Sequence, residues 1–590
     1  MTDARELQEM ADKLRMHSLI STTTAGSGHP TSCLSIAEIM STLFFHEMGQ
    51  DDEFIMSKGH AVPILWAAYA EAGFIDKKDL NTLRQIDSVL EGHPTPNMPL
   101  IKVATGSLGQ GLPAAVGMAL SKKLADNKGR VIVILGDGEC AEGSVWEAAN
   151  TAAYYKLENL CAIVDVNRLG QSQQTMHGHD VNPYVEKFRA FGWNALAVDG
   201  HDISQVTKAL EKIGEDGKPL AIIAKTIKGK GVSFIEDKIG WHGKPLSKED
   251  LEKALKEVGE HDITLTSQIT HTPIEYENTG FTPIRYDLGQ MISTRAAFGD
   301  SLVALGDSNH KVVAVDADVK NSTMMGEFFT KNPERGFQAF IAEQNMVGMA
   351  IGFSAMGYIP FVSTFSTFLT RAHDFIRMAR YSRSNIKFVG SHAGVSIGYD
   401  GPSQMGLEDL PMFLNIPDAL VIYPSDAVST TKLMNEMAVH TGISYLRTTR
   451  EKTPVIYDND EEFPLGGLKV VRSSEKDDAM IVSAGITLHE ALMAHDILKE
   501  KGINTRIIDL YSIQPLDTHA LVKNASECGG KVIMVEDHYC NAMGSLISNV
   551  VKDVIQVCIS NVPRSGSPKD LLTRFGLDSK SIAKIVEQTQ

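Results

Sequence analysis

Residues 131–167 of the chain read VIVILGDGECAEGSVWEAANTAAYYKLENLCAIVDVN. The first five of these residues are all apolar, and such a run before a glycine is typical of a strand that is buried on both faces of a parallel sheet. A helical pattern follows the segment GDGE at 136–139, and a second apolar run at 160–166 leads into Asn167. This order predicts an α/β domain in which Asp137 and Asn167 lie at the carboxyl ends of two parallel strands.

The position of these two side chains predicts a ligand site. Open α/β sheets bind ligands in the crevice at the carboxyl ends of their strands, so we expect Asp137 and Asn167 to face the same crevice. Carboxylate and amide oxygens suit Mg²⁺ or Ca²⁺, with phosphate oxygens and water completing the coordination.

A dinucleotide site is the main alternative for this stretch, because Gly136 and Gly138 are half of a dinucleotide-binding fingerprint. The third glycine is out of place, since position 141 is Ala and the next glycine is Gly143. Asp137 would also lie beside the pyrophosphate, where like charges repel unless a cation separates them. The stretch therefore favours a diphosphate held through a metal ion, while a plain polar turn stays open on this motif alone.

Length and composition limit the class of protein. A chain of 590 residues is too long for one hydrophobic core, so we expect several domains. The net charge of -17 argues against a nucleic-acid-binding protein, although it leaves room for a local basic pocket for a sugar phosphate. The N-terminal segment reads as a charged amphipathic helix rather than a signal peptide, and no apolar run approaches the roughly 18 residues of a membrane span.

The cysteines indicate a reducing compartment. No two of them form a CxxC pair, from which we expect no zinc site, no disulfide framework and a cytoplasmic protein. The six residues are Cys33, Cys140, Cys161, Cys528, Cys540 and Cys558.

Four histidines occupy loops rich in Gly or Pro: His29, His60, His93 and His242. A single loop histidine is usually solvated. Four of them at strand or helix ends are expected to converge on one polar substrate as hydrogen-bond donors or proton carriers. Their spacing does not indicate zinc, because no pair falls at i, i+4 on a helix.

Two further loops suit anions. The segment GSLGQGL at 106–112 precedes a helical pattern, so its backbone N–H groups can bind an anion. The segment KGKG at 228–231 follows an apolar run at 220–226. The alternative for Lys228 and Lys230 is a solvated basic turn.

Apolar runs alternate with helical patterns along the whole chain, which predicts three consecutive α/β domains with mainly parallel sheets. We expect the first domain at 1–260, a threonine-rich surface linker at 261–285, the second domain at 286–455 and the third at 456–590. In the second domain we expect a strand over residues 337–342 that leads into Glu343. The third domain has few clusters of loop His, Arg or Gly, so we expect it to be structural or to bind a partner or regulator.

The motif Gly136-Asp137-Gly138, followed by Asn167 at this spacing, resembles the thiamine-diphosphate motif. The segments around it, GDGECAEGSVWEAA and DVNRLGQS, resemble transketolases in particular. The resemblance covers nearly the whole chain through the segments SGHPTS, SKGH, GSLGQGL, WHGKPL, KNST, IAEQN, STF, GSHAGVSIG and DGPSQM. One departure is Gln404, which stands where many transketolases have a His.

The resemblance implies a thiamine-diphosphate-binding fold, with a diphosphate-binding first domain, an aminopyrimidine-binding second domain and a transketolase-type C-terminal domain. It implies a cation, Mg²⁺ or Ca²⁺, that is held by Asp137, Asn167 and the backbone carbonyl of Leu169. It also implies a set of residues that contact the coenzyme. These are Ser32, Lys58, His60, Gly106, Ser107, Leu108, Gly138, Asn167, Lys228, His242, Glu343, Phe365, Phe368 and Gln404.

By the same resemblance, Glu343 is the acid beside N1′ of the aminopyrimidine ring, where it promotes removal of the thiazolium C2 proton. We expect burial to keep Glu343 protonated, as this role requires. The alternative is a first-turn glutamate that favours the helix dipole. Phe365 and Phe368 would line the ring pocket, with Phe368 in contact with the ring, although core packing is the commoner role for Phe at this spacing.

The resemblance also implies how a substrate is bound. Arg295, Ser322, His392 and Arg450 match the family's grip on a sugar phosphate, and a guanidinium group binds phosphate bidentately. Asp400 matches the residue that contacts a hydroxyl group of the ketose. His29, His93 and His242 match those that contact substrate oxygens and move protons during cleavage, and together with Glu343 they are the implied catalytic residues.

The implied activity is that of a transketolase of the pentose phosphate pathway. A two-carbon ketol unit passes from a ketose phosphate such as xylulose 5-phosphate to an aldose phosphate such as ribose 5-phosphate or erythrose 4-phosphate, through the C2 carbanion of thiamine diphosphate. The family also implies a homodimer with its active sites at the subunit interface, and no nucleic-acid or membrane partner.

Three alternatives are kept. Deoxyxylulose-phosphate synthase uses the same coenzyme, but the segments at 241–243 and 320–322 favour transketolase. Dihydroxyacetone synthase differs only in its acceptor, formaldehyde. An inactive homologue would be indicated by loss of Glu343, Asp137 or the loop histidines, and all of them are present.

Overall fold

The computed structural model of the protein describes residues 3–270 and 273–589. The chain forms two compact units. Unit 1 comprises Met1–Glu275 with Val347–Met356, and unit 2 comprises Tyr276–Met346 with Gly357–Gln590. No helix within the described ranges is long and apolar enough to cross a membrane.

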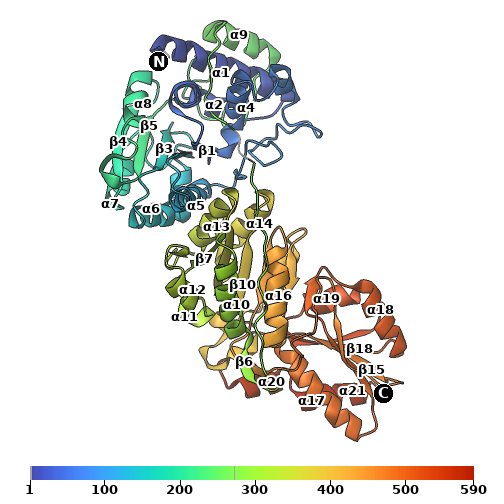
Figure 1. The fold of residues 1–590 in the computed structure, drawn as a ribbon. Helices are drawn as coiled ribbons and strands as arrows, with labels where there is room; N and C mark the ends of the chain where they lie inside the picture. Colours follow the sequence, from blue (N-terminus) through green and yellow to red (C-terminus); the bar gives the residue numbers. More distant parts are fainter. Residues whose placement is uncertain (1–2, 271–272, 590) are drawn as a thin grey trace. The chain divides into compact units, whose positions relative to one another are not determined.

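Unit 1 is built on a parallel sheet whose five strands lie in the order β1-β2-β3-β5-β4. Strand β3 is buried along its whole length, and β2 is buried up to its last residue, because helices lie on both sides of the sheet (Figure 1). Both strands fall where the apolar runs predict them. The strands are β1 (Glu53–Met56), β2 (Val131–Gly136), β3 (Leu160–Val166), β4 (Asn194–Asp199) and β5 (Leu220–Lys225).

The helices of unit 1 bury apolar side chains from α1, α3, α4 and α8 against the sheet residues Ile132, Ile134 and Ile222. The helices are α1 (Ala4–Ala25), α2 (Pro30–Leu34), α3 (Ala37–Thr42), α4 (Val62–Glu71), α5 (Gly111–Leu124), α6 (Gly143–Tyr154), α7 (Asn182–Ala190), α8 (Ile203–Leu210) and α9 (Lys248–Val258). The parallel strands leave their carboxyl ends, and the loops that follow them, at one edge of the sheet.

Unit 2 contains two larger sheets. The first has the order β17-β11-β12-β10-β9-β7-β8 and is parallel except for the β11–β17 pair. Its strands are β7 (Val312–Asp316), β8 (Gly336–Gln338), β9 (Ile359–Phe365), β10 (Lys387–Ser391), β11 (Leu420–Ile422), β12 (Ser444–Arg447) and β17 (Ser512–Gln514). A short antiparallel ribbon joins β6 (Met291–Ser293) to β13 (Lys452–Pro454). The helices around this sheet are α10 (Thr294–Ser308), α11 (Lys320–Thr323), α12 (Gly326–Lys331), α14 (His373–Tyr381), α15 (Asp409–Leu414) and α16 (Ala427–Val439). Helix α13 (Glu343–Ala355) begins in unit 2, and its residues from Val347 on belong to unit 1.

The other sheet of unit 2 is formed by the C-terminal part of the chain in the order β14-β16-β15-β18-β19, and only β14 runs antiparallel. Its strands are β14 (Lys469–Arg472), β15 (Ala479–Ser483), β16 (Thr505–Asp509), β18 (Val532–Tyr539) and β19 (Val554–Ile559). The accompanying helices are α17 (Ile486–Glu500), α18 (Thr518–Glu527), α19 (Met543–Ser548), α20 (Pro568–Arg574) and α21 (Ser579–Gln588). The predicted fold class, α/β with mainly parallel sheets, is confirmed by this topology.

The strand expected at 337–342 is shorter than predicted. Strand β8 ends at Gln338, and Phe340 adopts a positive φ of 59°, which breaks the extended conformation before Glu343. The apolar side chains of this segment do not belong to the core, since Phe340 and Ile341 are 39% and 78% exposed. The predicted strand at 337–342 is therefore wrong for residues 339–342.

The prediction that the cysteines form no disulfide was wrong for one pair. Cys540 and Cys558 form a disulfide with a Cα–Cα distance of 5.5 Å, while Cys33, Cys140, Cys161 and Cys528 are free and buried. The pair joins the segment after β18 to β19. The pairing of these two strands brings together two cysteines that are 18 residues apart in the sequence.

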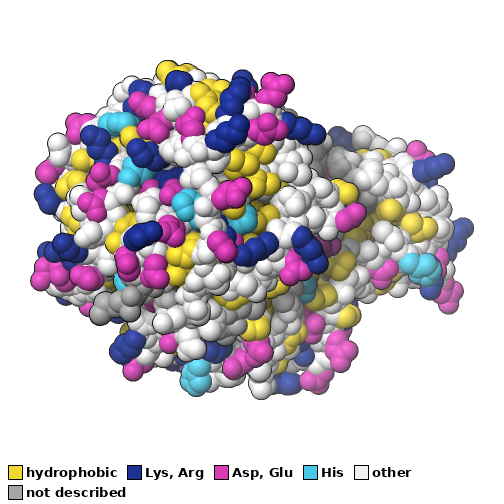
Figure 2. All heavy atoms as spheres, turned by 90° about the horizontal axis from the view of Figure 1, so that it is seen from above, with side chains coloured by type: hydrophobic (Ala, Val, Ile, Leu, Met, Phe, Trp, Pro, Cys, Tyr) yellow, Lys and Arg dark blue, Asp and Glu magenta, His cyan; other side chains and the backbone are white. Residues whose placement is uncertain are grey.

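The described residues of the segment 261–285 form no helix or strand. Residues 271–272 of the predicted linker lie outside the described ranges, as do residues 1–2 and 590 at the outer limits of the first and third predicted domains. On the face that Figure 2 presents, Lys and Arg side chains are interspersed with Asp and Glu, and no extended patch carries one sign of charge.

Candidate active site

A cavity of about 500 Å³ lies at the carboxyl edge of the unit 1 sheet. Lys58, Asp137 and Asn167 enter it from the loops that directly follow β1, β2 and β3, which explains why strand ends carry the polar motifs of the sequence. Its lining consists of His29, Lys58, His60, His93, Gly106, Leu108, Gly136, Asp137, Gly138, Glu139, Asn167, Leu169, Gly170, Gln171, Lys228 and His242. Most residues that the sequence assigned to unit 1 therefore lie around one cavity.

Two predicted contacts are outside this lining. The hydroxyl group of Ser32 is buried and has no hydrogen-bond partner among the described residues, while its carbonyl oxygen accepts a hydrogen bond from Lys58 Nζ at 3.1 Å. Ser107 lies between the lining residues Gly106 and Leu108, but it is not part of the cavity wall. Gln171, Gly170 and Glu139 line the cavity and were missed by sequence reasoning.

The oxygen atoms around Asp137 suit a divalent cation. The Asp137 carboxylate accepts hydrogen bonds from the backbone N–H groups of Gly138 (2.9 Å) and Arg168 (3.0 Å) and from the hydroxyl group of Thr175 (2.8 Å). Burial, and then the nearby Asp165, raise the pKa of Asp137. A bound cation would favour the charged carboxylate, so the residues present fit a metal ion.

Asn167 and Leu169 supply neutral oxygens to the same cavity. Asn167 Oδ1 accepts a hydrogen bond from the Leu169 N–H at 3.3 Å, and the Leu169 carbonyl accepts one from Lys228 Nζ at 2.7 Å. The described residues hold no cluster of three or more His, Cys, Asp or Glu side chains that could bind a metal. One carboxylate, one amide and one carbonyl oxygen leave several positions open for phosphate oxygens and water, which is a set that Mg²⁺ or Ca²⁺ accepts.

Asp165, which sequence reasoning missed, fixes the side chains of Asn167 and Lys58 in the cavity wall. Its Oδ2 atom accepts hydrogen bonds from Asn167 Nδ2 (2.7 Å) and Ser35 Oγ (2.8 Å), and it forms an ion pair with Lys58. Asp165 is fully buried. Burial alone would raise its pKa, but the Lys58 ammonium and the hydrogen bonds outweigh burial and lower the pKa below its usual value.

Glu139 forms hydrogen bonds to three loops around the cavity. Its carboxylate accepts hydrogen bonds from the N–H groups of Gly136 and Gly109, each at 2.9 Å, and from the hydroxyl group of Ser57. Burial raises the pKa of Glu139 despite these bonds. The loops after β1 and β2 and the turn before α5 are thus held by one side chain.

The structure places the four loop histidines side by side. The His29 ring centroid lies 5.3 Å from that of His60, 5.2 Å from that of His242 and 6.3 Å from that of His93. Burial, and then the Arg84 guanidinium, lower the pKa of His29 to about 4. The pKa of His93 is lowered by the same two causes, and burial with the nearby lysines lowers that of His60 well below the ordinary value. At neutral pH these imidazoles are therefore uncharged, and each offers one donor and one acceptor.

Arg84, which was also missed, bridges two of the histidine loops. Its Nη1 donates to Ser27 Oγ at 2.8 Å, two residues before His29. Its guanidinium packs on Gly92, where an added Cβ would lie 2.7 Å from Arg84 Nε. The residue therefore fixes the loops that carry His29 and His93 and brings a positive charge close to both rings.

Lys228 determines which ring nitrogen of the fourth histidine, His242, carries the proton. Its ammonium donates to His242 Nδ1 at 2.6 Å, so the neutral His242 ring carries its proton on Nε2. Burial and the charge of Lys228 lower the pKa of His242 to about 3. Burial and the neighbouring Lys58 lower the pKa of Lys228 itself to about 7, and a bound phosphate would favour the charged form of both lysines.

In unit 2, Glu343 begins helix α13 and is 7% exposed. Its Oε2 lies 3.3 Å from Nε of Arg371, whose side chain is 71% exposed. Phe365 ends β9, and Phe368 begins a short 3-10 helix at Phe368–Ala372. Their rings are stacked with centroids 5.2 Å apart, and Phe365 also stacks on His392 at 3.7 Å. Phe365, Phe368 and His392 thus form one stacked group of rings.

The residues predicted to bind a sugar phosphate form two groups in unit 2. Arg295 Nη1 donates to the Ser322 carbonyl at 2.7 Å and lies 3.4 Å from His392 Nε2. Arg450 Nη1 pairs with Asp400 Oδ2 at 2.7 Å. Gln404 is half-buried, and its amide donates to Ser403 Oγ at 3.4 Å.

These charges suit an anion. Burial, and then Arg450, lower the pKa of Arg295, and burial with both arginines lowers that of His392 to about 3. The Nε atom of Arg295 has no hydrogen-bond partner among the described residues. A guanidinium with an unbonded N–H, beside a second arginine and a neutral histidine, is the arrangement that a phosphate dianion would satisfy.

Comparison with known families connects the cavity to a coenzyme. Residues 6–275 match the family model described as "Transketolase, thiamine diphosphate binding domain", residues 290–455 match the pyrimidine binding domain, and residues 468–582 match the C-terminal domain. The fold and the site therefore define a thiamine-diphosphate-dependent enzyme. The chain is 46% identical to transketolase from Homo sapiens over 98% of its own length and 97% of that protein. The chain belongs to the transketolase family.

Other relatives agree with this assignment. The chain is 47% identical to transketolase-like protein 2 from Mus musculus, over 99% of its own length and 97% of that protein. The crystal structure of transketolase from Campylobacter jejuni matches with a TM-score of 0.89 at 24% identity and covers 100% of both chains, which shows the same fold.

Proposed function

We propose that the protein transfers a two-carbon ketol unit from a ketose phosphate to an aldose phosphate, as a step of the pentose phosphate pathway. The observation that carries the proposal is the pairing, in one chain, of a cation-and-diphosphate cavity with a cluster of arginines suited to a sugar phosphate. Thiamine diphosphate, when bound, supplies a nucleophilic carbon that adds to the keto group of the donor.

The diphosphate group would be held in unit 1. Lys58, Lys228 and His60 offer side-chain donors, and the loop at Gly106 offers backbone N–H groups before helix α5. Asp137, Asn167 and the Leu169 carbonyl would hold Mg²⁺ or Ca²⁺ between the protein and the phosphate oxygens. Ser32, Ser107, Leu108 and Gly138 complete the proposed contacts on this side.

Unit 2 would hold the aminopyrimidine ring and its proton. Glu343 is buried and would form a hydrogen bond with N1′ of the ring, so that the ring can act as a base. Phe365 and Phe368 would contact the ring faces, with Phe368 as the main contact, and Gln404 would lie on the coenzyme side.

The four neutral imidazoles suit the proton transfers of this reaction. A neutral His29 or His93 can accept the proton of a sugar hydroxyl group as the carbon–carbon bond breaks, and can return it to the acceptor. The Nε2–H of His242, fixed by Lys228, provides a donor to the substrate oxygen.

The sugar phosphate would be bound in unit 2 by Arg295, Ser322, His392 and Arg450. Asp400, which now pairs with Arg450, would turn to a hydroxyl group of the ketose. Exchange of this ion pair for two substrate contacts costs little, because both side chains are more than two-fifths exposed, at 42% and 45%.

We further propose a symmetric homodimer whose active sites lie at the subunit interface, each formed by unit 1 of one chain and unit 2 of the other. The distribution of residues supports this proposal. Unit 1 carries the residues proposed to bind the diphosphate, and unit 2 carries those proposed to bind the aminopyrimidine ring and the sugar phosphate. We keep 1–260, 286–455 and 456–590 as the proposed domain limits, with the linker at 261–285.

A cytoplasmic location is proposed as well. The four free cysteines support a compartment in which disulfides are uncommon, whereas the Cys540–Cys558 bond argues for oxidising conditions. Alkylation under denaturing, non-reducing conditions, with cells lysed directly into the alkylating agent, would count the free thiols. Six alkylated cysteines would support the cytoplasm, and four would contradict it.

The test of the main proposal is a coupled assay with xylulose 5-phosphate and ribose 5-phosphate. Turnover should require both thiamine diphosphate and Mg²⁺ or Ca²⁺, and Glu343→Ala should lower kcat at least about 100-fold while still binding coenzyme. Coenzyme binding without turnover of this pair would exclude the proposed substrates. Full activity of Glu343→Ala would exclude the role given to that residue.

A further inference from the structure

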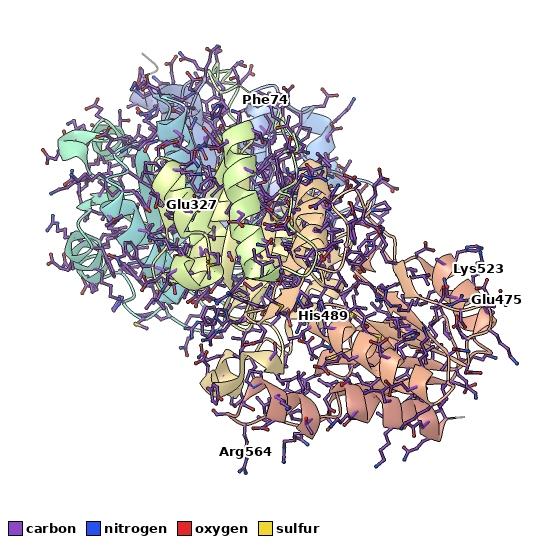
Figure 3. All side chains as sticks on the ribbon, turned by 60° about the horizontal axis from the view of Figure 1, so that its bottom comes forward. Phe74, Glu327, Glu475, His489, Lys523 and Arg564 are labelled. Atoms are coloured by element: carbon purple, nitrogen blue, oxygen red, sulfur yellow. A yellow bond between two sulfur atoms is a disulfide. The ribbon has the colours of Figure 1, made fainter. Side chains whose placement is uncertain are left out.

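The carboxyl edge of the C-terminal sheet, where an open α/β sheet binds its ligand, is filled by other parts of unit 2. Strand β15 lies between β16 and β18, so the strand order reverses between β15 and β18. This is the position of a ligand crevice. Asp537 of β18 lies there and is fully buried. His489 of α17, labelled in Figure 3, donates from Nε2 to the Ser425 carbonyl at 2.7 Å.

Asp537 is paired with a buried arginine from the other large sheet. Arg447 ends β12, and its Nη1 lies 2.6 Å from Asp537 Oδ1. The same guanidinium binds Asp409 through Nε at 2.9 Å and donates from Nη2 to the Gly406 carbonyl at 2.9 Å. Tyr423 completes the group by donating its hydroxyl to Asp537 Oδ2 at 3.1 Å. Arg447 thus links Asp537 of the C-terminal domain to the backbone at Gly406.

Residues 394–406, which we term the donor loop, carry Asp400 and Gln404. The loop begins directly on Asp537: Gly394 has a φ of 74°, and an added Cβ would lie 1.8 Å from Asp537 Oδ2. Gly401 has a φ of 84°, and its added Cβ would lie 2.5 Å from Ser565 Oγ. Two positions of the loop therefore need glycine because the C-terminal domain approaches so closely.

The apolar side chains of the same region belong to the core of the C-terminal domain. Val395, Ile397, Met405 and Leu407 are at most 2% exposed and pack with Ile481, Ile533 and other residues of that core. The Leu407 carbonyl also accepts a hydrogen bond from the Tyr539 N–H at 3.3 Å. The donor loop is therefore anchored at both ends and packed at Gly401, while the Asp400 side chain stays 45% exposed and accessible to a substrate.

We propose that Asp537 is a positioning residue for ketose-phosphate binding, because it fixes both ends of the donor loop, one by direct contact with Gly394 and the other through Arg447. The inference rests on the proposed function of Asp400 in that site. It gives the C-terminal domain a part in donor recognition, although none of its own residues would contact the substrate.

The experiment compares Asp537→Asn with wild type as full-length protein loaded with thiamine diphosphate and Mg²⁺. Two donors are used: xylulose 5-phosphate, and hydroxypyruvate, which delivers the same two-carbon unit by losing CO₂ and has no hydroxylated phosphate tail. We expect kcat/KM for xylulose 5-phosphate to fall about 10-fold or more, mainly through KM, because small misplacements of positioning groups cost this much. We expect kcat/KM for hydroxypyruvate to stay within about two-fold of wild type, since that donor does not reach Asp400.

Asp477→Asn is the matched control. Asp477 is also a buried carboxylate of the C-terminal domain, paired with Arg506 at 3.0 Å, but it does not contact the donor loop. We expect it to leave both donors unchanged. An equal loss for both donors in Asp537→Asn, or a loss for xylulose 5-phosphate as large in Asp477→Asn, would overturn the proposal.

A second measurement does not depend on activity. Hydrogen exchange of residues 394–406 should be faster in Asp537→Asn than in wild type, and unchanged in Asp477→Asn. Tyr423→Phe, which removes one hydrogen bond to Asp537 and keeps the ion pair, should give a smaller change in the same direction and covers the case in which Asp537→Asn does not fold. Unchanged exchange in both variants would contradict the positioning role, whereas an inactive wild type would contradict only the proposed function.

Discussion

The cavity of unit 1 and the substrate cluster of unit 2 are built in different ways. In unit 1 the polar groups rest on buried carboxylates: Lys58 and Asp165 form an ion pair with side chains 1% and 0% exposed. In unit 2 the corresponding pair, Arg450 with Asp400, has side chains 42% and 45% exposed. The buried ion pair of unit 1 holds its side chains in place before any ligand binds. The ion pair of unit 2 lies at the surface and can be exchanged for contacts with a ligand.

This difference indicates that the coenzyme site is preorganised and that the substrate site is not. A resident coenzyme binds once and must be held in one geometry, which a fully bonded, buried frame provides. A substrate enters and leaves at each turnover, and weak surface pairs can be exchanged for substrate contacts at little cost. Changes to the frame should therefore affect coenzyme binding, and changes to the surface pairs should affect only the substrate.

The largest effect is expected for Asp165→Asn. This change removes the ion pair with Lys58 and weakens the hold on Asn167, so the affinity for thiamine diphosphate with Mg²⁺ should fall about 10- to 100-fold. Titration calorimetry measures it. Asp199→Asn is the control, because Asp199 ends strand β4 of the same parallel sheet but is exposed and does not line the cavity. A dissociation constant within two-fold of wild type in Asp165→Asn would remove the distinction between the two regions.

A smaller effect is expected for Asp400→Asn. The amide keeps the shape but weakens the contact with a sugar hydroxyl, so kcat/KM for the ketose phosphate should fall about 10-fold. The affinity for the coenzyme should not change. Asp374→Asn provides the control, since Asp374 forms a similarly exposed pair with Arg377 at 2.9 Å through Nε, on helix α14. A loss of coenzyme affinity in Asp400→Asn would show that the two regions are not independent.

The smallest effect concerns pH. The pKa of His29 is about 4, so its ring stays neutral as the pH falls to 5, and kcat/KM should not decline near pH 6.5 as it would for an ordinary imidazole. Arg84→Met removes a cation that lowers the pKa of His29 and His93. Their pKa values then rise, and the acid limb of the kcat/KM profile should move up by about one pH unit or less. Arg84→Lys keeps the charge and should keep the limb in place. Superimposable profiles for wild type and Arg84→Met would refute this account.

Much of the fold could be predicted from the sequence because parallel strands leave an apolar run that ends in a polar tip. The runs before Asp137 and Asn167 are such cases, and β2 and β3 fall where they predict. Loops rich in glycine marked the positions of Lys58, His60 and Gly106 around the cavity for the same reason, since a backbone that approaches a ligand needs these residues.

The supporting residues could not be predicted. Asp165 stands inside the run CAIVDV, where a lone carboxylate gives no sign that it bonds to Lys58 more than 100 residues away. Arg84 lies in a polar loop, and its contacts to Ser27 and Gly92 depend on how three loops meet. The Cys540–Cys558 bond depends on the pairing of β18 with β19, which cysteine spacing does not reveal.

The most direct test of the account is whether the two regions complement each other between chains. Asp137→Ala impairs unit 1 and Glu343→Ala impairs unit 2, so each variant alone should be inactive. The two are co-expressed with different tags, and the heterodimer is purified by both tags. If each active site combines unit 1 of one chain with unit 2 of the other, one of its two sites is intact, and the heterodimer should have about half of the wild-type activity. A heterodimer no more active than either parent would contradict the shared site.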